Sequence, residues 1–382
     1  MRNTPAQIAF VLSACLNVIG CSESPNAESL AVQKLRETSS DPDWETAKWG
    51  VEVGAELWIK TPDNKTAKIE TNQDLVKFKK RPFQIVSFSG TSTGSEIDDD
   101  ALEHLRGLRK LRGFFISGSK VTGRGLKKLK DSLLLEDVQL SNSPVKAEEL
   151  VHLKLFPKLR TVIMWGSKSG DAAADTFASL ENLKFLVLDG TDVSDVTLEK
   201  IRGLKNIESL SLGGTHISDA GTVHLTGFKK LKTLNLGSTD ITDISLKRFR
   251  EIPSLEYLDL AVTKITDSGV SKLAELPNLR GLSLDETACT GNAIKLLEKA
   301  TNLKQLSLSQ TQITDADMST LAELKSLQAV FLERTRLTDE GIAKLASLPN
   351  LEEICVDGTM VTDKGKRVLK RASPKVKIIE LD

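Results

Sequence analysis

The chain has 382 residues, with 52 basic and 52 acidic side chains and therefore no net charge at pH 7. That balance argues against nucleic acid as a general partner, because such proteins carry a strongly basic surface. Four cysteines and four histidines leave little material for a disulfide framework or a metal centre.

The N-terminus has the pattern of an export signal. Arg2 precedes an apolar run from Ile8 to Ile19 that ends at Gly20-Cys21, too short to cross a bilayer as a helix. Residues 1–20 resemble a bacterial lipoprotein signal peptide. The resemblance implies that Cys21 becomes the first mature residue and carries acyl chains that anchor it in a membrane. An ordinary secretory signal followed by an unrelated cysteine is the alternative.

The residue after the cysteine bears on the location of the exported protein. It is Ser22 rather than Asp, and the lipoprotein resemblance then favours the outer membrane, with the protein either periplasmic or surface-exposed.

A polar stretch follows the signal. Residues 21–50 contain Pro25 and Pro42 and few apolar side chains, so we predict a tether between the anchor and the folded part. Trp44 and Trp49 leave open the alternative that the end of this stretch belongs to a folded cap.

Residues 51–82 are expected to form an N-terminal cap. Two runs with strand-like alternation, VEVGAELWI and TAKIE, flank a turn at Pro62-Asp63-Asn64. The ends of a repeat array must be covered, and this segment directly precedes the first repeat.

From Leu111 onward one phrase returns every 24 residues, as in LEYLDLAVTKITDSGVSKLAELPN. A fixed period of this length predicts a solenoid, in which each unit buries its apolar face against its neighbours. The units open at Leu111, Leu135, Leu159, Leu183, Ile207, Leu231, Leu255, Leu279, Leu303, Leu327 and Leu351.

Each unit combines a strand with a short helix. In the unit that opens at Leu255, apolar residues first alternate as in a strand and then recur at three-residue spacing, as in a short helix or 3₁₀ segment. Thr266 and Asp267 suit a helix start, as a capping oxygen and a negative charge. Pro277 stands just beyond the helix end.

The phrase LxxLxLxxTx(I/V)(T/S)DxGLxxLxxL resembles a leucine-rich repeat, and its ITDxGL half is similar to bacterial GALA repeats and to the repeats of F-box proteins. The resemblance implies an α/β solenoid, a horseshoe or arc with a parallel concave β-sheet and short convex helices. It covers residues 83–374 in about 12 units, the first of them degenerate, with four extra residues around Thr91 to Ser95.

A threonine occupies the corner of most units, where the commoner repeat has Asn or Cys. We expect its hydroxyl to bond the turn backbone of the adjacent unit. The column comprises Thr191, Thr215, Thr239, Thr263, Thr287, Thr311, Thr335 and Thr359.

Residues 375–382 are expected to add one C-terminal edge strand, shifted by one residue relative to the period. Lys375, Lys377, Glu380 and Asp382 flank or interrupt that strand. Charges at a sheet edge disfavour pairing with another chain, so we expect a monomer.

No catalytic, cofactor or metal site is predicted. His104, His152, His216 and His224 lack zinc-ligand spacing, and the strand-face carboxylates are dispersed over many units. The run Asp98-Asp99-Asp100 matches the capping phrase of later units rather than a calcium loop. We therefore expect no enzyme activity. The dispersed carboxylates are Asp189, Asp259, Asp285, Glu333 and Asp357.

The two cysteines of the repeat region are predicted to remain unpaired. Cys289 occupies a core column, whereas Cys355 is expected to point outward from a strand. Their units are three apart, roughly 14 Å at strand spacing, which is too far for a disulfide.

Charge is unevenly distributed in the N-terminal part. Lys60 to Lys130 contain 16 Lys or Arg against 8 Asp or Glu. This region could rest on anionic lipid headgroups, but a solvated basic surface is the simpler interpretation. Its cations include Lys77, Lys79, Lys80, Arg81, Lys127, Lys128 and Lys130.

The outward strand positions are the remaining candidates for function. Ile163, Trp165, Phe185 and Val187 lie on neighbouring strands and form an apolar cluster in a chain with 4% aromatic residues. Such a patch with polar surroundings is a candidate interaction site. The alternative is that Trp165 and Phe185 are covered by a loop, or that they compensate for a weakened core at Ser169.

Tyr257 and Phe331 are weaker second candidates on later strands. Together these residues predict a non-catalytic, lipid-anchored scaffold that recognises a protein or glycan through its concave sheet. A structural envelope component without a selective ligand is the main alternative. An F-box-like adaptor is opposed by the lipobox and by the lack of a helical F-box segment ahead of the repeats.

Overall fold

Strands and short helices alternate along the chain with the period of the sequence. The computed structural model describes residues 41–79, 81–90 and 97–380, which form an N-terminal unit (residues 41–193) and a C-terminal unit (residues 194–380). Several predicted features lie outside the described residues: the signal peptide, the proposed lipidation site Cys21, the tether up to residue 40, Lys80 and the insertion at Thr91 to Ser95.

The N-terminal unit begins with a helix and a β-hairpin and continues with repeats. In chain order its elements are α3 (Pro42–Glu52), β1 (Glu56–Lys60), β2 (Thr66–Ile69), α4 (Asn72–Lys77), β3 (Gln84–Gly90), η3 (Ala101–Leu105), β4 (Gly113–Ser117), η4 (Arg124–Leu129), β5 (Asp137–Ser141), η5 (Ala147–Leu155), β6 (Thr161–Ile163), η6 (Asp171–Ala173), α5 (Ala174–Ala178) and β7 (Phe185–Val187).

The C-terminal unit consists of repeats throughout. Its elements are α6 (Asp195–Ile201), β8 (Ser209–Ser211), η7 (Gly221–Gly227), β9 (Thr233–Asn235), α7 (Asp243–Phe249), β10 (Tyr257–Asp259), α8 (Asp267–Leu273), β11 (Gly281–Ser283), α9 (Gly291–Leu296), η8 (Leu297–Lys299), β12 (Gln305–Ser307), α10 (Met318–Leu321), β13 (Ala329–Phe331), α11 (Asp339–Lys344), η9 (Leu345–Ser347), β14 (Glu353–Cys355), α12 (Asp363–Ala372) and β15 (Lys377–Ile379).

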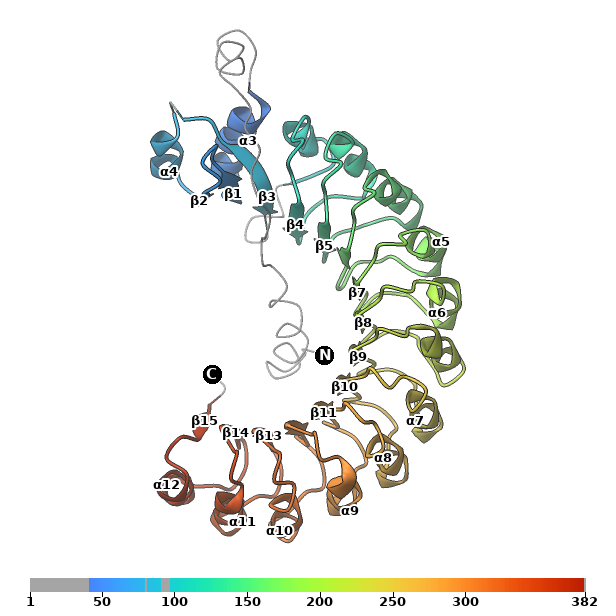
Figure 1. Ribbon diagram of the computed structural model, residues 1–382, viewed down its shortest axis with the longest axis vertical. Helices are drawn as coiled ribbons and strands as arrows, with labels where there is room; N and C mark the ends of the chain where they lie inside the picture. Colours follow the sequence, from blue (N-terminus) through green and yellow to red (C-terminus); the bar gives the residue numbers. More distant parts are fainter. Residues whose placement is uncertain (1–40, 80, 91–96, 381–382) are drawn as a thin grey trace. The chain divides into compact units, whose positions relative to one another are not determined.

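Each unit presents a sheet on one side and its helices on the other (Figure 1). In the N-terminal unit the strand order is β2-β1-β3-β4-β5-β6-β7, with β1 antiparallel to both β2 and β3 and the later pairs parallel. In the C-terminal unit β8 to β15 follow one another in parallel. This is the predicted solenoid of leucine-rich repeats.

The register of the parallel strands equals the sequence period. Leu258 pairs with Leu282, and Leu282 with Leu306, each 24 residues on. The last strand keeps this register, since Cys355 pairs with Ile379. The expected one-residue shift of the edge strand is therefore wrong. Only the apolar pattern of the side chains shifts there, because the backbone ladder continues through Lys377 N–H donating to the Glu352 carbonyl at 2.7 Å.

The core lies between the sheet and the helices. The helix-facing strand residues have no exposed surface, and burying each such apolar side chain contributes about 1.5–3 kcal/mol. They include Phe114, Val138, Val162 and Leu186 in the N-terminal unit, and Leu210, Leu258, Leu282, Leu306 and Val330 in the C-terminal unit.

The capping prediction for the helix starts is confirmed. Thr266 is the N-cap of α8, and its hydroxyl accepts from the Ser268 N–H at 3.3 Å. The aspartate that follows each cap also reaches into the next unit, which the sequence analysis missed. Asp243 accepts from the Thr266 N–H at 2.9 Å and from the Thr266 hydroxyl at 2.6 Å.

This contact between a cap and the preceding aspartate recurs along the array as a ladder. The same pair of bonds links Asp99 to Thr122, Asp195 to Ser218, Asp219 to Thr242, Asp267 to Thr290, Asp315 to Thr338 and Asp339 to Thr362. Asp99 thus takes the ladder position of the later aspartates, while Asp98 accepts from the Asp100 and Ala101 N–H groups at 3.0 and 2.8 Å at the start of η3.

One step of the ladder is inverted. Gly291 stands where every other unit from Leu159 onward has the aspartate, so Thr314 of the next unit receives no carboxylate from the preceding unit. Asp317, within the unit of Thr314, supplies it and accepts from the Thr314 N–H at 2.9 Å and its hydroxyl at 3.0 Å. A Cβ on Gly291 would lie 1.7 Å from the Asp317 Oδ1. The two residues are therefore sterically coupled.

The corner threonines bond within their own unit, so the expected bond to the adjacent unit is wrong. Thr263 donates its hydroxyl proton to the Leu260 carbonyl at 2.5 Å, and Thr335 donates to the Leu332 carbonyl at 2.7 Å. Three residues of turn bring that carbonyl within reach of the hydroxyl. The column closes each corner and does not link the units.

Helix α3 corrects the predicted tether, which was expected to run to Gly50. The helix begins at Pro42, where proline suits the first turn, and the Asp41 side chain caps it by accepting from the Asp43 N–H at 3.2 Å. Thr46 and Ala47, on the inner face of this helix, are fully buried. Residues 42–50 therefore belong to the folded cap, the alternative that Trp44 and Trp49 left open.

Three ring contacts, made by two tryptophans, hold α3 against its neighbours. The Trp49 ring is stacked on Phe88, with ring centroids 5.4 Å apart, and on His104, at 4.8 Å. The Trp44 ring packs against Phe83 at 6.1 Å.

None of the helices that the described residues form has the length and apolar character needed to cross a membrane.

Candidate apolar interface on the strand face

The predicted cluster lies on the uncovered face of the sheet in the N-terminal unit. Thr161, Val162 and Ile163 of β6 pair with Phe185, Leu186 and Val187 of β7. The middle residue of each triplet is fully buried on the helix side. Side chains alternate along a strand, so Ile163, Phe185 and Val187 face away from the helices.

Exposure differs among the four predicted residues. Trp165 is 43% exposed and Val187 only 8%, while Ile163 and Phe185 are half-buried. Trp165 is thus open to solvent and not covered by a loop of the described chain. The accessible centre of the cluster is Trp165, Ile163 and Phe185, with Val187 packed at its margin.

The structure adds Phe115, which the sequence analysis did not single out. Phe115 pairs with Gln139, and Gln139 with Ile163, in the outward row that ends at Val187. Its ring lies over Gly113, where a Cβ would come within 2.5 Å of the ring. The repeat count placed Phe115 in the same column as Ile163, and that was the available signal.

We call Phe115, Ile163, Trp165, Phe185 and Val187 the apolar strip. It crosses four neighbouring strands, β4 to β7, and therefore extends over roughly 14 Å at ordinary strand spacing. The core beneath it is altered at Ser169, as the sequence suggested. Ser169 is fully buried and lies 3.4 Å from the Ser167 hydroxyl, so the missing apolar side chain is replaced by a polar contact.

A row of charged residues borders the strip where the strands begin, which we call the strand-entry edge. Glu136 lies between two guanidinium groups, 3.2 Å from Arg112 and 3.4 Å from Arg160. Lys184 stands at the same position one unit later, directly before Phe185. Three of the four residues in this row are basic, and only Glu136 is acidic.

The weaker candidates Tyr257 and Phe331 lie on the uncovered face of the C-terminal unit, three strands apart, and both are half-buried. Between them the outward positions are small and polar, as at Gly281, Ser283 and Ser307. The structure does not bring Tyr257 and Phe331 together as one patch.

Carboxylates that are dispersed in the sequence become linked on this face. Asp285 accepts from the Ser307 hydroxyl at 2.5 Å and from the Ser309 N–H at 2.7 Å, while the Ser309 hydroxyl donates to Glu333. Burial raises the pKa of Asp285 to about 7 and also raises the pKa of Asp259. Hydrogen bonds from serine only partly offset the loss of water around these groups.

Cys355 lies on the outward row of its strand, as expected, but it is not exposed there. Its side chain is on the outward row but fully buried, between Phe331 and Ile379 on the adjacent strands. Burial raises the pKa of its thiol to about 12, and that of the core residue Cys289 to about 11. Both thiols are unpaired and too weakly acidic for nucleophilic chemistry at neutral pH.

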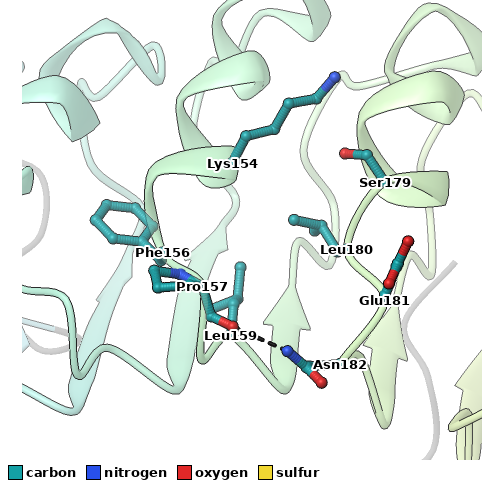
Figure 2. A pocket seen from close by; sticks show the side chains of 8 residues that line it. All are labelled: Lys154, Phe156, Pro157, Leu159, Ser179, Leu180, Glu181 and Asn182. Atoms are coloured by element: carbon teal, nitrogen blue, oxygen red, sulfur yellow. Dashed lines mark hydrogen bonds between the residues drawn. The ribbon is translucent and has the colours of Figure 1, made fainter.

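Clusters of metal-binding side chains and pockets are the other kinds of site that the rest of the described chain could offer. No cluster of three or more His, Cys, Asp or Glu among its residues could hold a metal ion. A hollow of about 260 Å³ lies between two successive repeats of the N-terminal unit, near Lys154, Leu180 and Asn182 (Figure 2). The Asn182 amide there donates to the Pro157 carbonyl at 2.9 Å, a bond that Asn278 and Asn302 repeat in later units, so the amide is structural.

The basic region near the cap is partly neutralised. Lys77 lies 2.8 Å from Asp74, and Lys128 lies 3.3 Å from Asp100. Lys127 and Lys130 are exposed. Both this region and the strand-entry edge therefore keep exposed basic side chains.

Comparison with known proteins agrees with this architecture. Two leucine-rich repeat family models match the chain, one over residues 205–265 and one over residues 299–322. No curated protein matches the sequence. Among solved structures, an internalin (InlF) of Listeria monocytogenes is similar in fold, with a TM-score of 0.57 and 21% identity over 93% of this chain and 99% of that one.

Two further structures overlap with the chain less closely. Internalin C2 of Listeria monocytogenes is 30% identical, with a TM-score of 0.37 over 49% of this chain and 76% of its own. A leucine-rich repeat protein of Leptospira interrogans is 19% identical, with a TM-score of 0.44 over 73% and 80%.

Proposed function

We propose that this chain of leucine-rich repeats is a non-catalytic binding scaffold that recognises a protein through the apolar strip. The observation that carries the proposal is the 43% exposure of Trp165 beside the half-buried Phe185 and Ile163. Large aromatic side chains on a rigid sheet supply contact area at little entropic cost, and such residues dominate binding energy at protein interfaces.

We further propose that lipidated Cys21 holds this scaffold at the bacterial cell envelope. The support is the apolar run ending at Gly20-Cys21 in the sequence. Replacing Cys21 with Ala removes the acylation site, so the protein should move from the membrane fraction to the soluble fraction. Unchanged membrane association would count against the anchor.

The binding role is tested with a soluble form from Ser22 to Asp382 as bait for envelope proteins. A variant with Trp165→Ala and Phe185→Ala should lose specific captured proteins, because the exposed aromatic area is removed. Trp58→Ala, an exposed tryptophan on the cap hairpin (44% exposed), is the matched control. If all three forms capture the same set, the scaffold acts as a structural spacer instead.

A further inference from the structure

We propose that the partner of the apolar strip is acidic: a protein segment whose apolar side chains cover Trp165 and Phe185 while its carboxylates meet the cations of the strand-entry edge. This inference rests on the proposed function and names the chemistry of the partner.

The connecting segments that lead into the strands of the N-terminal unit are strongly basic. Segments 106–112, 130–136, 154–160 and 178–184 together carry nine Lys or Arg and three Asp or Glu. Arg109, Lys110, Lys130 and Lys158 are exposed. One of the three carboxylates, that of Glu136, is already shared by two guanidinium groups, so the edge keeps a positive excess.

These cations lie next to the strip. Arg160 immediately precedes Thr161, which pairs with Phe185, and Lys184 immediately precedes Phe185 itself. A segment whose apolar side chain rests on Phe185 therefore has its neighbouring polar groups close to these two cations. Complementary charge at the rim of an apolar contact raises the association rate and selects the partner.

Two carboxylates lie close to the strip, the half-buried Asp137 and the buried Asp189. Asp137 is half-buried beside Thr161 on the next strand. Burial raises the pKa of Asp137, and neither carboxylate is fully exposed to solvent.

The C-terminal unit lacks this combination. Its seven equivalent segments, from 202–208 to 346–352, carry ten basic and seven acidic residues. Its uncovered face holds three buried carboxylates, Asp259, Asp285 and Glu333, whereas the N-terminal unit has one in the same columns, Asp189. An acidic segment is therefore favoured at the N-terminal unit and disfavoured at the C-terminal one.

The test is a selection of short random peptides on the soluble form from Ser22 to Asp382, with subtraction on the Trp165→Ala, Phe185→Ala variant. We expect the retained peptides to be enriched in Asp and Glu next to aromatic or aliphatic residues. Binding of the best peptide should weaken at least about tenfold in an Arg160→Glu, Lys184→Glu variant and fall with ionic strength.

The matched control is Arg280→Glu, Lys304→Glu, which reverses charge at the same repeat positions of the C-terminal unit; Arg280 faces Glu256 at 3.5 Å much as Arg160 faces Glu136. Its peptide affinity should stay within about twofold of wild type. An equal loss in both variants would show a nonspecific charge effect and overturn the inference.

The remaining outcomes separate the two proposals. Retained peptides that are basic or neutral, or that ignore Arg160 and Lys184, would overturn the acidic partner and leave the binding strip in place. Absence of any peptide that depends on Trp165 and Phe185 would count against the proposed function itself. Charge-dependent binding to phosphatidylglycerol vesicles without peptide binding would assign the edge to a membrane and overturn the inference.

Discussion

Single side chains at the helix starts carry many of the contacts between successive repeats. An aspartate such as Asp243 accepts two hydrogen bonds from the next cap, Thr266, at 2.9 and 2.6 Å. Hydrogen bonds to a charged acceptor are worth roughly 1.5–3 kcal/mol where they are shielded, and less where they are exposed. The ladder therefore adds a directional term to stacking that is otherwise driven by apolar burial.

The inverted step of the ladder allows a stringent test. Asp317→Gly removes the acceptor of the Thr314 N–H, and Gly291→Asp places a carboxylate against Asp317, so each change alone should lower the free energy of unfolding by about 1–3 kcal/mol. The double variant restores the arrangement of the other units and should recover most of that loss. Urea unfolding of all four forms measures the coupling.

Additive losses in that double variant would show that the two positions are independent. Gly269→Asp with Asp317→Gly serves as the control, because Gly269 faces Asp243 rather than Asp317, and this pair should give no recovery.

The buried carboxylate Asp285 should make stability depend on pH. Burial raises its pKa from 3.8 to about 7, so the folded protein keeps a proton there that the unfolded chain has released. Its contribution to stability is full below about pH 4 and is lost as the pH rises to 7, on the order of 4 kcal/mol. Asp285→Asn should flatten this decline in urea unfolding between pH 5 and 8.

Asp339→Asn is the control of opposite sign. Hydrogen bonds from the Thr362 backbone and hydroxyl lower the pKa of Asp339, so its contribution is lost as the pH falls below the ordinary range of aspartate. This variant should therefore change the acid side of the profile and leave the interval from pH 5 to 8 unaltered. An Asp285→Asn profile parallel to wild type would contradict the assignment.

For single residues, the sequence predicted where the capping side chains stand better than it predicted which groups the side chains hydrogen-bond. The caps at Thr266 and Asp267 follow from local chemistry and were found. Whether the hydroxyl of Thr263 turns to its own unit or to the next depends on turn geometry, which a repeat consensus does not contain. The coupling of Asp317 to Gly291 was not predicted, because these two residues meet only when one repeat packs on the next.

Among the elements, the cap shows how little composition says about a docked helix. Residues 42–50 are polar and contain a proline, which is why they were predicted as tether. The proline falls at the first helical position after a capping aspartate, Asp41, where it favours a helix. The aromatic contacts of Trp49 with β3 and η3 then give the helix a fixed place.

Trp49→Ala should destabilise the cap selectively. The ring is stacked on both Phe88 and His104, so its loss should cost about 2–3 kcal/mol. Hydrogen exchange should accelerate in α3 and β3 and remain slow in the repeats of the C-terminal unit. Trp58→Ala, an exposed tryptophan of the neighbouring hairpin, should leave exchange in α3 unchanged; equal effects of the two variants would refute the stacking role.

Over the whole molecule, the repeat period predicted the sheet, the helices and the core, because a 24-residue register is fully written in the apolar columns. The candidate site was predicted in part. Trp165 and Phe185 were found from their columns, whereas the inclusion of Phe115 and the burial of Val187 and Cys355 depend on neighbouring strands. Exposure is a property of packing between units, and single columns do not reveal it.

Stability of the folded repeats is non-covalent, and this has a measurable consequence. Cys289 and Cys355 are fully buried, with thiol pKa values raised to about 11 and 12. In the soluble form from Ser22, Ellman's reagent should therefore react with neither thiol under native conditions and with both after unfolding. Fast native labelling would show that the C-terminal unit opens readily, and a reductant should leave the melting temperature unchanged.

The exchange between Gly291 and Asp317 also bears on how such an array can change length in evolution. Duplicating or deleting a single repeat between or at these two positions would leave one cap without a carboxylate or set a carboxylate against another. The unit that opens at Leu279 and the unit that opens at Leu303 are therefore matched to each other, and we expect a change of repeat number to be tolerated less at this junction than among the units that keep the regular aspartate.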